Sequence, residues 1–293
     1  METKRLLHLI YLSVFVIILA ACGSDQTSAD GNRLEELKNS GTVKIGFANE
    51  KPYAYEENGE LKGANVEIAQ AVFKELGIET IEPQLADFSQ LIPGLQAGQF
   101  DVVTAGMAIT PDRCERVQFS EPELQYGEGL IVKAGNPLNL QSYEDIANNS
   151  DVTVVVMEGA TEIEFLEQSG VNPNQIVTAP DIAATFSAVQ SGRAEATTGT
   201  EMTVKMALDS LNSNELEFVE TFKQPDVDGV PSYGASAFNI EDADLRDAYN
   251  EVLNQLKEDG TVAEILEANG FSEQSNMVNV GEVTTAQACS GEV

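Results

Sequence analysis

Short apolar runs alternate with longer amphipathic stretches along most of the chain, from about residue 34 to residue 269. Runs such as Thr42–Ala48 and Phe100–Ala105 have the length and composition of buried strands, whereas Val66–Leu76 has the apolar spacing of a helix. Strands that alternate with helices in this way form a parallel sheet with helices on both faces. The pattern therefore predicts an α/β fold.

The rhythm of strand and helix occurs twice, which indicates two α/β lobes. In the second half we expect strands at Val152–Val156, Gln175–Thr178 and Ala194–Thr198, and helices at Glu162–Gln168, Ile182–Ser191 and Glu201–Leu211. Two extended stretches, Glu128–Lys133 and Tyr233–Ile240, are expected to cross between the lobes. Such an architecture leaves a cleft in which small ligands bind and over which the lobes close by a hinge motion.

The N-terminal segment has the features of a secretory signal. Lys4 and Arg5 precede an apolar run, Leu9–Leu19, which is too short to span a bilayer comfortably. The run ends in Leu-Ala-Ala-Cys22, which resembles a bacterial lipobox and predicts lipidation of Cys22; a plain signal peptide or an uncleaved anchor is the alternative. We therefore divide the chain into a signal peptide (1–21), a flexible tether (22–33), a first lobe (34–131 and 234–275), a second lobe (132–233) and an irregular C-terminal tail (276–293).

Composition excludes several classes of function. The formal net charge is −32, and removal of residues 1–21 leaves 14 basic and 47 acidic residues, so nucleic acid is a poor partner for the surface. The single histidine, His8, lies in the signal segment, and we expect no metal site, no histidine-dependent catalysis and no cofactor. The remaining pair, Cys114 and Cys289, suggests one disulfide in an exported protein, with two free thiols as the alternative.

A candidate anion site follows the strand Phe100–Ala105. Gly106 is expected to end that strand, and Thr110-Pro111-Asp112 predicts a helix start with a hydroxyl N-cap and a proline in the first turn. The unpaired N–H groups of a helix N-terminus attract anions, and Arg113 on this first turn suits a carboxylate. Taken alone, Arg113 could equally be a surface residue on a capped helix.

Three loops of the first lobe are expected to meet at one sheet edge. They are Asn49–Tyr53, Asp87–Phe88 and Gly106–Arg113, each at the carboxyl end of a predicted strand, where α/β sheets bind ligands. In the second lobe, Gly159–Thr161 precedes a helix and forms a second candidate anion site. A ligand in the cleft would thus meet residues of both lobes.

Six phrases occur in order along the chain: GANVEIAQAVFKELG (63–77), LIPGLQAGQFDVVTAGM (91–107), ITPDRCERVQFSEP (109–122), GATEIEFL (159–166), SGRAEA (191–196) and LKEDGTVAEILEANGF (256–271). Together with the lipobox they resemble the family 3 extracellular solute-binding proteins, over about residues 34–272. The resemblance implies the periplasmic-binding-protein-like type II fold, a monomer, and no enzyme activity. It also implies delivery of a small zwitterionic ligand to an ABC permease in the membrane.

Within that family, the chain looks most like the ectoine and hydroxyectoine binders. The phrase ANEKPY (48–53), the pair Arg113-Cys114 and the late Cys289 carry this likeness. Amino acid binders of the family usually have an aromatic residue where Glu50 stands, and an aspartate for the substrate's ammonium where Thr200 stands. A buried ammonium without its carboxylate costs about 3–5 kcal/mol, so the resemblance implies a ligand without a primary amine unless Glu50 replaces the aspartate.

The resemblance also implies how the acidic end of ectoine would be held. Arg113 would bind the carboxylate, helped by the N–H groups of Gly106 and Ala108 and by Thr161 of the second lobe. Thr161 could instead be only a helix N-cap. Relatives can carry a third aromatic residue where Ala108 stands, so the aromatic cage of this chain is either incomplete or completed by Phe47 or Tyr126.

At the other end, the resemblance implies a site for the delocalised cation. Glu50 would pair with the amidinium, Thr200 would donate a hydrogen bond, and the rings of Tyr53 and Phe88 would contact the cation for up to ~2 kcal/mol. Alternatively, Tyr53 and Phe88 only cover strand ends, and Glu50 is an exposed loop carboxylate. Two further acids near the second anion site, Glu158 and Glu162, are expected to be solvated.

We therefore expect a lipid-anchored extracytoplasmic receptor that captures ectoine or hydroxyectoine by closing its lobes. A receptor for a polar amino acid or an opine is the alternative of the same class, with Glu50 binding the amine. A secreted enzyme similar to cyclohexadienyl dehydratase would use Glu50 or Glu158 as its acid. A sensor domain that signals by ligand-driven closure is a third class.

Overall fold

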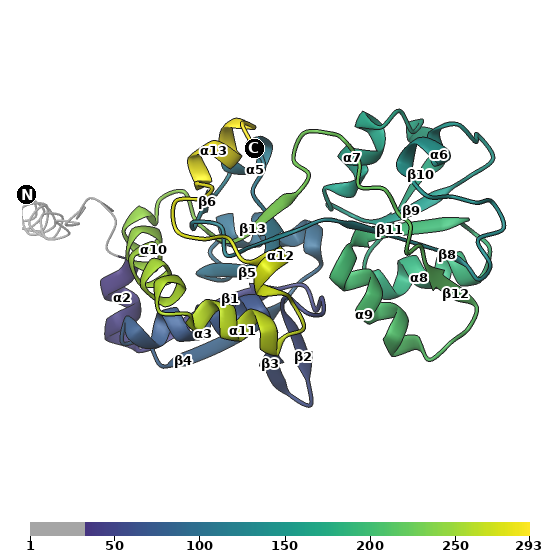
Figure 1. The fold of residues 1–293 in the computed structure, drawn as a ribbon. Coiled ribbons are helices and arrows are strands. Elements are labelled where there is room, and N and C mark those ends of the chain that lie inside the picture. The colour runs from purple at the N-terminus through teal and green to yellow at the C-terminus, as the bar shows by residue number, and fades with distance from the viewer. Residues whose placement is uncertain (1–32) are drawn as a thin grey trace, which may run out of the picture. The chain divides into compact units, whose positions relative to one another are not determined.

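The computed structural model describes residues 33–293, which form two larger β-sheets and one short hairpin with helices packed around them (Figure 1). The predicted signal peptide, the lipidation site Cys22 and the tether up to residue 32 lie outside the described residues. Among residues 33–293, no helix is long and apolar enough to cross a membrane. The expected fold class of two α/β lobes is confirmed.

The first sheet combines parallel and antiparallel strands. Its order is β4 (Thr80–Leu85), β1 (Thr42–Phe47), β5 (Val102–Ala108), β13 (Ser232–Phe238) and β6 (Gln118–Phe119), with β7 (Leu124–Tyr126) also paired to β13. Strand β1 runs parallel to β4 and β5, whereas β13 runs antiparallel to β5. Within this first sheet, the expected parallel arrangement is therefore correct only for the strands β4, β1 and β5.

The central strand β5 is buried along its whole length because its successive side chains enter two different cores. Val102 belongs to the core beneath α3 (Ala64–Glu75), α10 (Ala243–Glu258) and α11 (Thr261–Ala268), and α2 (Arg33–Ser40) packs there too. Val103 belongs to the core on the other face, with η1 (Phe88–Gln90), α4 (Leu91–Gln96), α5 (Pro111–Cys114) and α13 (Thr285–Ser290). Such double burial explains why β5 is apolar except for Thr104, whose side chain is also buried.

The second sheet has the strand order β10 (Ile176–Ala179), β9 (Val154–Met157), β11 (Ala196–Thr200), β8 (Glu128–Lys133) and β12 (Leu216–Phe218). Its helical segments are α6 (Tyr143–Ala147), α7 (Glu162–Gln168), η2 (Pro173–Gln175), α8 (Ile182–Gln190) and α9 (Glu201–Leu211). Val154 and Val156 face one core and Val155 the other, which explains the valine run of β9. The helices predicted at Glu162–Gln168 and Glu201–Leu211 are confirmed.

The chain passes between the two sheets twice, after β7 and after β12. The dipeptide Asn58-Gly59 predicts a hairpin turn, and β2 (Tyr55–Glu57) and β3 (Glu60–Lys62) pair around it. Both turn residues have positive φ angles, of 57° and 81°, as a tight hairpin turn demands.

Two local expectations about helix and strand ends are wrong. Strand β5 does not end before Gly106 but continues through it to Ala108. Asn65 directly before the expected helix Val66–Leu76 predicts an N-cap, but helix α3 begins at Ala64, so Asn65 is a helical residue. The Asn65 side chain is buried and donates a hydrogen bond to the Glu123 carboxylate. The Asn65 side chain therefore bonds the buried Glu123 carboxylate instead of capping the helix.

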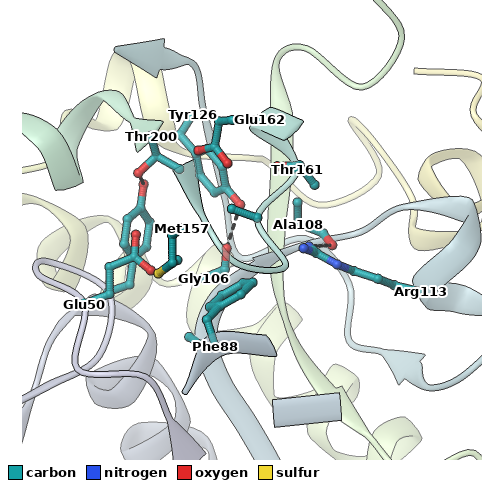
Figure 2. Close-up of a pocket in the computed structure, with 13 residues that line it drawn as sticks. Glu50, Phe88, Gly106, Ala108, Arg113, Tyr126, Met157, Thr161, Glu162 and Thr200 are labelled. Atoms are coloured by element: carbon teal, nitrogen blue, oxygen red, sulfur yellow. Dashed lines mark hydrogen bonds between the residues drawn. The ribbon is translucent and has the colours of Figure 1, made fainter. Parts of the chain in front are cut away.

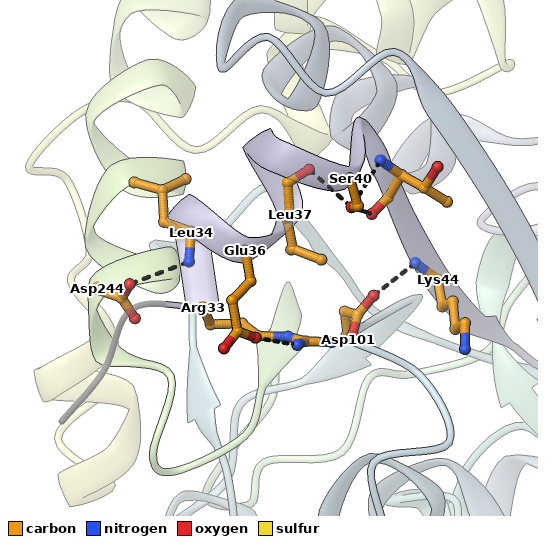
Figure 3. A network of polar contacts seen from close by, with 9 residues as sticks. Arg33, Leu34, Glu36, Leu37, Ser40, Lys44, Asp101 and Asp244 are labelled. Atoms are coloured by element: carbon orange, nitrogen blue, oxygen red, sulfur yellow. Dashed lines mark hydrogen bonds and ion pairs between the residues drawn. The ribbon is translucent and has the colours of Figure 1, made fainter. Parts of the chain in front are cut away.

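Helix α2 is tied to the first lobe by a polar network (Figure 3). The Arg33 guanidinium pairs with Asp101 and, at 2.6 Å, with Glu36. The second oxygen of Asp101 accepts the backbone N–H of Lys44 at 2.8 Å. The backbone N–H of Leu34 donates to Asp244 at 3.1 Å, so the start of the described chain is held by β1, by the residue before β5, and by α10.

The short helix α12 (Glu273–Asn276) ends where the C-terminal tail (276–293) begins, and the tail, expected to be irregular, contains helix α13. A disulfide joins Cys114 of α5 to Cys289 of α13, with 5.8 Å between their Cα atoms. The Thr285 hydroxyl adds a 2.6 Å hydrogen bond to the carbonyl of Ser120. The polar composition of the tail did not predict helix α13, because a docked helix usually has an apolar face. Here the disulfide and the hydrogen bond to the Ser120 carbonyl hold the helix instead.

Gly106 lets strand β5 continue because its φ of 59° lies in the left-handed region, which glycine adopts without strain. A Cβ at this position would lie 2.3 Å from Cδ1 of Tyr53. The Gly106 carbonyl accepts a 2.6 Å hydrogen bond from the Tyr126 hydroxyl. The position thus brings two tyrosines against the strand where the first-lobe loops converge.

We predict that Gly106→Ala destabilises the protein more than Gly41→Ala. Gly41 has a φ of 67° and open space where a Cβ would stand, so its variant suffers only backbone strain, of about 1–3 kcal/mol. Gly106→Ala adds the overlap with the Tyr53 ring. Denaturant unfolding of both variants measures the difference, and equal losses would contradict the packing described here.

Replacing both Cys114 and Cys289 by serine is expected to lower the free energy of unfolding by about 2–5 kcal/mol, because the disulfide spans 175 residues and restricts the unfolded chain. Urea unfolding measures the loss, with the exposed Ser290→Ala on the same helix as the control. Unchanged stability of the double variant would show that the bridge contributes nothing.

Candidate functional site

A pocket lies where the two lobes face each other, and residues of both line it (Figure 2). The first lobe contributes Glu50, Tyr53, Phe88, Ala105, Gly106, Ala108, Arg113 and Tyr126, and the second contributes Met157, Ala160, Thr161, Glu162 and Thr200. All of the ligand residues expected from the sequence are in this set. The structure therefore brings them together, although their contact with a ligand stays a prediction.

Arg113 is positioned by the helix start that the sequence predicted. The Thr110 hydroxyl accepts the backbone N–H of Arg113 at 3.3 Å and caps α5. The guanidinium donates from Nη1 to the Ala108 carbonyl at 2.8 Å and from Nη2 to the Gly159 carbonyl of the second lobe at 3.0 Å. The Phe88 ring centroid lies 5.5 Å from the Arg113 Cζ. These contacts hold the guanidinium at the pocket and leave further N–H groups for an anion.

The other residues expected at the carboxylate end lie in local surroundings that the sequence did not indicate, and their contact with a ligand stays a prediction. Gly106 and Ala108 were expected to offer N–H groups from a loop, but both lie in strand β5, and their carbonyls accept hydrogen bonds from Tyr126 and Arg113. Thr161 occupies the N-cap position of α7, but its side chain makes no capping hydrogen bond. Its hydroxyl is therefore not used by the helix and lines the pocket instead.

A chain of hydrogen bonds crosses between the lobes at the other side of the pocket. The Tyr53 hydroxyl donates to Thr200 at 3.1 Å, Thr200 donates to Thr203 at 3.0 Å, and Thr203 donates to Oε1 of Glu50 at 2.6 Å. Tyr53 and Glu50 belong to the first lobe and the threonines to the second. Sequence reasoning missed Thr203, although it lies one helical turn after Thr200 in α9, on the same face.

Glu50 is not the exposed loop carboxylate of the simpler interpretation. Its side chain is 7% exposed, and burial raises its pKa to about 7, against the opposing effect of the hydrogen bond from Thr203. The nearby Glu162 carboxylate contributes to this rise in the pKa of Glu50. Glu50 can therefore gain or lose a proton near neutral pH, according to whether a cation stands beside it.

The aromatic residues divide between the pocket and its support. The Tyr53 ring meets the Tyr126 and Phe271 rings at centroid distances of 5.4 Å and 5.3 Å. Of the two candidates for the aromatic residue missing at Ala108, Tyr126 lines the pocket, whereas Phe47 packs in a separate core cluster with Ala54 and Val66. Phe88 lines the pocket while it covers Arg113.

The expectation that Glu162 is solvated is wrong. Glu162 begins helix α7, is 3% exposed and lines the pocket, whereas Glu158 is exposed as expected. Behind Glu162 lies Glu128 of β8, which is 1% exposed. The sequence did not indicate that Glu128 is buried, because a single acid directly before the apolar run GLIV looks like a surface residue at the start of a strand.

The pocket thus has charges of opposite sign on different walls. Figure 2 shows Arg113 on one side and Glu50 on the other, with Glu162 on a further wall. Burial lowers the pKa of Arg113 and raises those of Glu50 and Glu162, since charged forms lose hydration there. In the described part of the chain, no group of His, Cys, Asp or Glu side chains could hold a metal ion. The arrangement suits a small molecule with an anionic and a cationic end.

Comparison with known proteins identifies the family of the chain that forms this pocket. The model of the bacterial extracellular solute-binding proteins, family 3, matches residues 43–270. The probable amino-acid ABC transporter periplasmic-binding protein y4tE of Sinorhizobium fredii is 40% identical over 262 residues, 88% of this chain and 86% of that protein. The arginine-binding extracellular protein ArtP of Bacillus subtilis is 26% identical over 262 residues, 89% of this chain and 96% of that protein.

Among solved structures, the crystal structure of EhuB in complex with hydroxyectoine is similar, with a TM-score of 0.80 and 34% identity over 89% of this chain and 98% of that chain. The type II periplasmic-binding fold expected from the sequence is therefore confirmed. The protein binds a solute and is not an enzyme, because the family model covers both lobes and the pocket between them. The chain belongs to the bacterial extracellular solute-binding proteins of family 3.

Proposed function

We propose that this protein is the receptor of an ABC importer and that it captures ectoine or hydroxyectoine by closing its two lobes. The similarity to EhuB bound to hydroxyectoine supports the ligand, and the similarity to the probable amino-acid ABC transporter periplasmic-binding protein y4tE supports the role in an importer. A lipid anchor at Cys22, a monomeric state and docking on a membrane permease belong to the same proposal.

The observation that carries this proposal is the separation of charge across the pocket. The Arg113 guanidinium is fixed by two carbonyls and a ring on one wall, while Glu50 and Glu162 occupy other walls. Ectoine has one carboxylate for the guanidinium and one delocalised amidinium for the acids. The amidinium carries two N–H groups, so a single cation can contact carboxyl groups on two walls.

Thr200 supports a ligand without a primary amine. Its hydroxyl is already engaged with Tyr53 and Thr203, at 3.1 Å and 3.0 Å. A hydroxyl in place of a carboxylate offers no charge to an α-ammonium group, which strongly prefers a buried counter-ion. The flat amidinium instead finds the Tyr53 and Tyr126 rings in the pocket wall.

A receptor for a polar amino acid is the second candidate, and one observation favours it. Glu162 was expected in solvent but lines the pocket, so it can pair with an ammonium group in place of the aspartate missing at Thr200. The 40% identity to the probable amino-acid-binding protein y4tE agrees with this alternative. A direct comparison of ligands separates the two.

Isothermal titration with ectoine, hydroxyectoine, glutamine, arginine and ornithine is expected to show binding of the first two. Arg113→Ala should weaken their binding by at least about 100-fold, because it leaves a buried carboxylate without its partner. Arg116→Ala, an exposed arginine just after the same helix, is the matched control and should bind normally. Tight binding of an amino acid, with none of ectoine, would overturn the choice of ligand.

Affinity for ectoine is expected to fall as the pH drops below 7. A cation pairs only with ionised Glu50, whose pKa in the empty pocket is about 7, so binding must first displace a proton at lower pH. Well below that value the dissociation constant should rise up to about tenfold per pH unit, a free-energy change of about 1.4 kcal/mol. Titrations from mildly acidic to mildly basic pH test this, and Glu50→Gln should flatten the profile; an equally steep profile in that variant would exclude Glu50 as the group responsible.

A further inference from the structure

Glu128 is a buried acid that lies behind the pocket wall and does not line it. The residue starts β8 opposite Thr200 of β11, and its side chain is 1% exposed. Its backbone is satisfied by Gln224, whose side chain accepts the Glu128 N–H at 2.7 Å and donates to the Glu128 carbonyl at 2.8 Å. The backbone N–H and carbonyl of Glu128 thus have hydrogen-bond partners, and only its carboxyl group still needs one.

No ordinary donor serves that carboxyl group. Both of its oxygens are buried without a donor, and no ion pair involves Glu128 among residues 33–293. The hydroxyls nearby are used elsewhere, since Tyr126 donates to Gly106 and Tyr143 bonds Thr198 at 2.6 Å. An ionised carboxylate without partners is costly in such a place, which requires Glu128 to carry a proton.

The proton has one acceptor, the carboxylate of Glu162. The Glu128 and Glu162 carboxyl groups come together because Glu162 Oε1 lies beside Gly199 of β11, and Glu128 pairs with the next residue of that strand, Thr200. They are hydrogen-bonded to each other, and two carboxyl groups can hydrogen-bond only when a proton lies between them. Of the two, Glu162 holds the negative charge better, because it begins helix α7, bonds its own backbone N–H and faces Arg113. Burial and the negative charges of Glu162 and Glu50 raise the pKa of Glu128 well above its usual range.

The groups that face this pair come from every element around it. Glu50 and Tyr53 approach from the first-lobe loop, Tyr126 from β7, Arg113 from α5, and Tyr143 from α6. Of these groups only Arg113 is cationic, and its guanidinium donates hydrogen bonds to the carbonyls of Ala108 and Gly159 rather than to Glu128. The pair therefore carries a single negative charge.

We propose that Glu128 is a positioning residue that stays protonated at neutral pH and donates its O–H to Glu162. The hydrogen bond holds the Glu162 carboxylate ionised at the pocket wall, where it meets the cationic part of the ligand; this last step rests on the proposed function. The shared proton also sets the charge of this wall, which matches one delocalised cation and disfavours a ligand with two positive groups.

Infrared difference spectroscopy of the full-length protein tests the proton without any ligand. At a pH above 7, where Glu50 is mostly ionised, wild type minus Glu128→Gln should show the carbonyl stretch of a protonated carboxyl, apart from the carboxylate and amide bands. Glu123, also buried, contributes to both spectra and cancels. Absence of that band from the difference overturns the proposal.

Titration of the same variants with ectoine tests the positioning role. Glu128→Gln keeps an N–H donor and should bind within about threefold of wild type, whereas Glu128→Leu removes the donor and should bind about 10- to 100-fold more weakly. Thr197→Val, at another fully buried side chain of the second sheet whose hydroxyl has no partner, is the matched control and should bind normally. Equal weakening by glutamine and leucine would show that Glu128 only fills space, which overturns the proposal.

The two readouts separate this inference from the proposed function. If the infrared band is assigned to Glu128 but neither ectoine nor hydroxyectoine binds, the ligand is wrong and the protonated pair stands. If ectoine binds and the band is missing, the ligand stands and the proposed state of Glu128 is wrong. Should Glu128→Leu fail to fold, the spectra and binding of Glu128→Gln still decide, since loss of binding with the donor retained contradicts the proposal.

Discussion

The structure depends on placing charges of both signs in one pocket from which most water is removed. A buried charge is stable only when hydrogen bonds or counter-charges replace its hydration. Arg113 meets this condition through two carbonyls and the Phe88 ring. The acids meet it differently, because Glu50 relies on a threonine hydroxyl and Glu162 on its helix start and a neighbouring carboxyl group. Each solution leaves part of the charge available to a ligand.

The same residues also connect the two lobes. Arg113 of the first lobe bonds Gly159 of the second, Tyr53 bonds Thr200, and Thr203 bonds Glu50. A molecule that enters the pocket must therefore interact with groups that already bridge the lobes. Ligand binding and the arrangement of the lobes are coupled by shared atoms, which is the physical basis of capture by closure in a two-lobed receptor.

Charge also separates the ligand classes that such a pocket can bind. The position that carries a carboxylate in many amino acid binders is Thr200 here, while carboxyl groups appear at Glu50 and Glu162 instead. The wall formed by Thr200 therefore carries no negative charge, whereas the walls formed by Glu50 and Glu162 carry carboxyl groups. This distribution is the basis of the proposed preference for a planar amidinium with two separated N–H groups over a compact ammonium, whose charge is concentrated on one nitrogen.

The sequence alone determined the two α/β lobes, the helix start that presents Arg113, and eight of the residues that line the pocket. These features depend on local patterns: apolar periodicity, N-cap chemistry and short phrases shared with a family. Only the tertiary structure decided that Gly106 lies within a strand, that Asn65 serves Glu123, that the tail forms α13, and that Glu128 and Glu162 are buried together. Each of these depends on a partner far along the chain, and the burial of an acid cannot be inferred from its neighbours in sequence, because its cost is set by the groups that the fold brings around it.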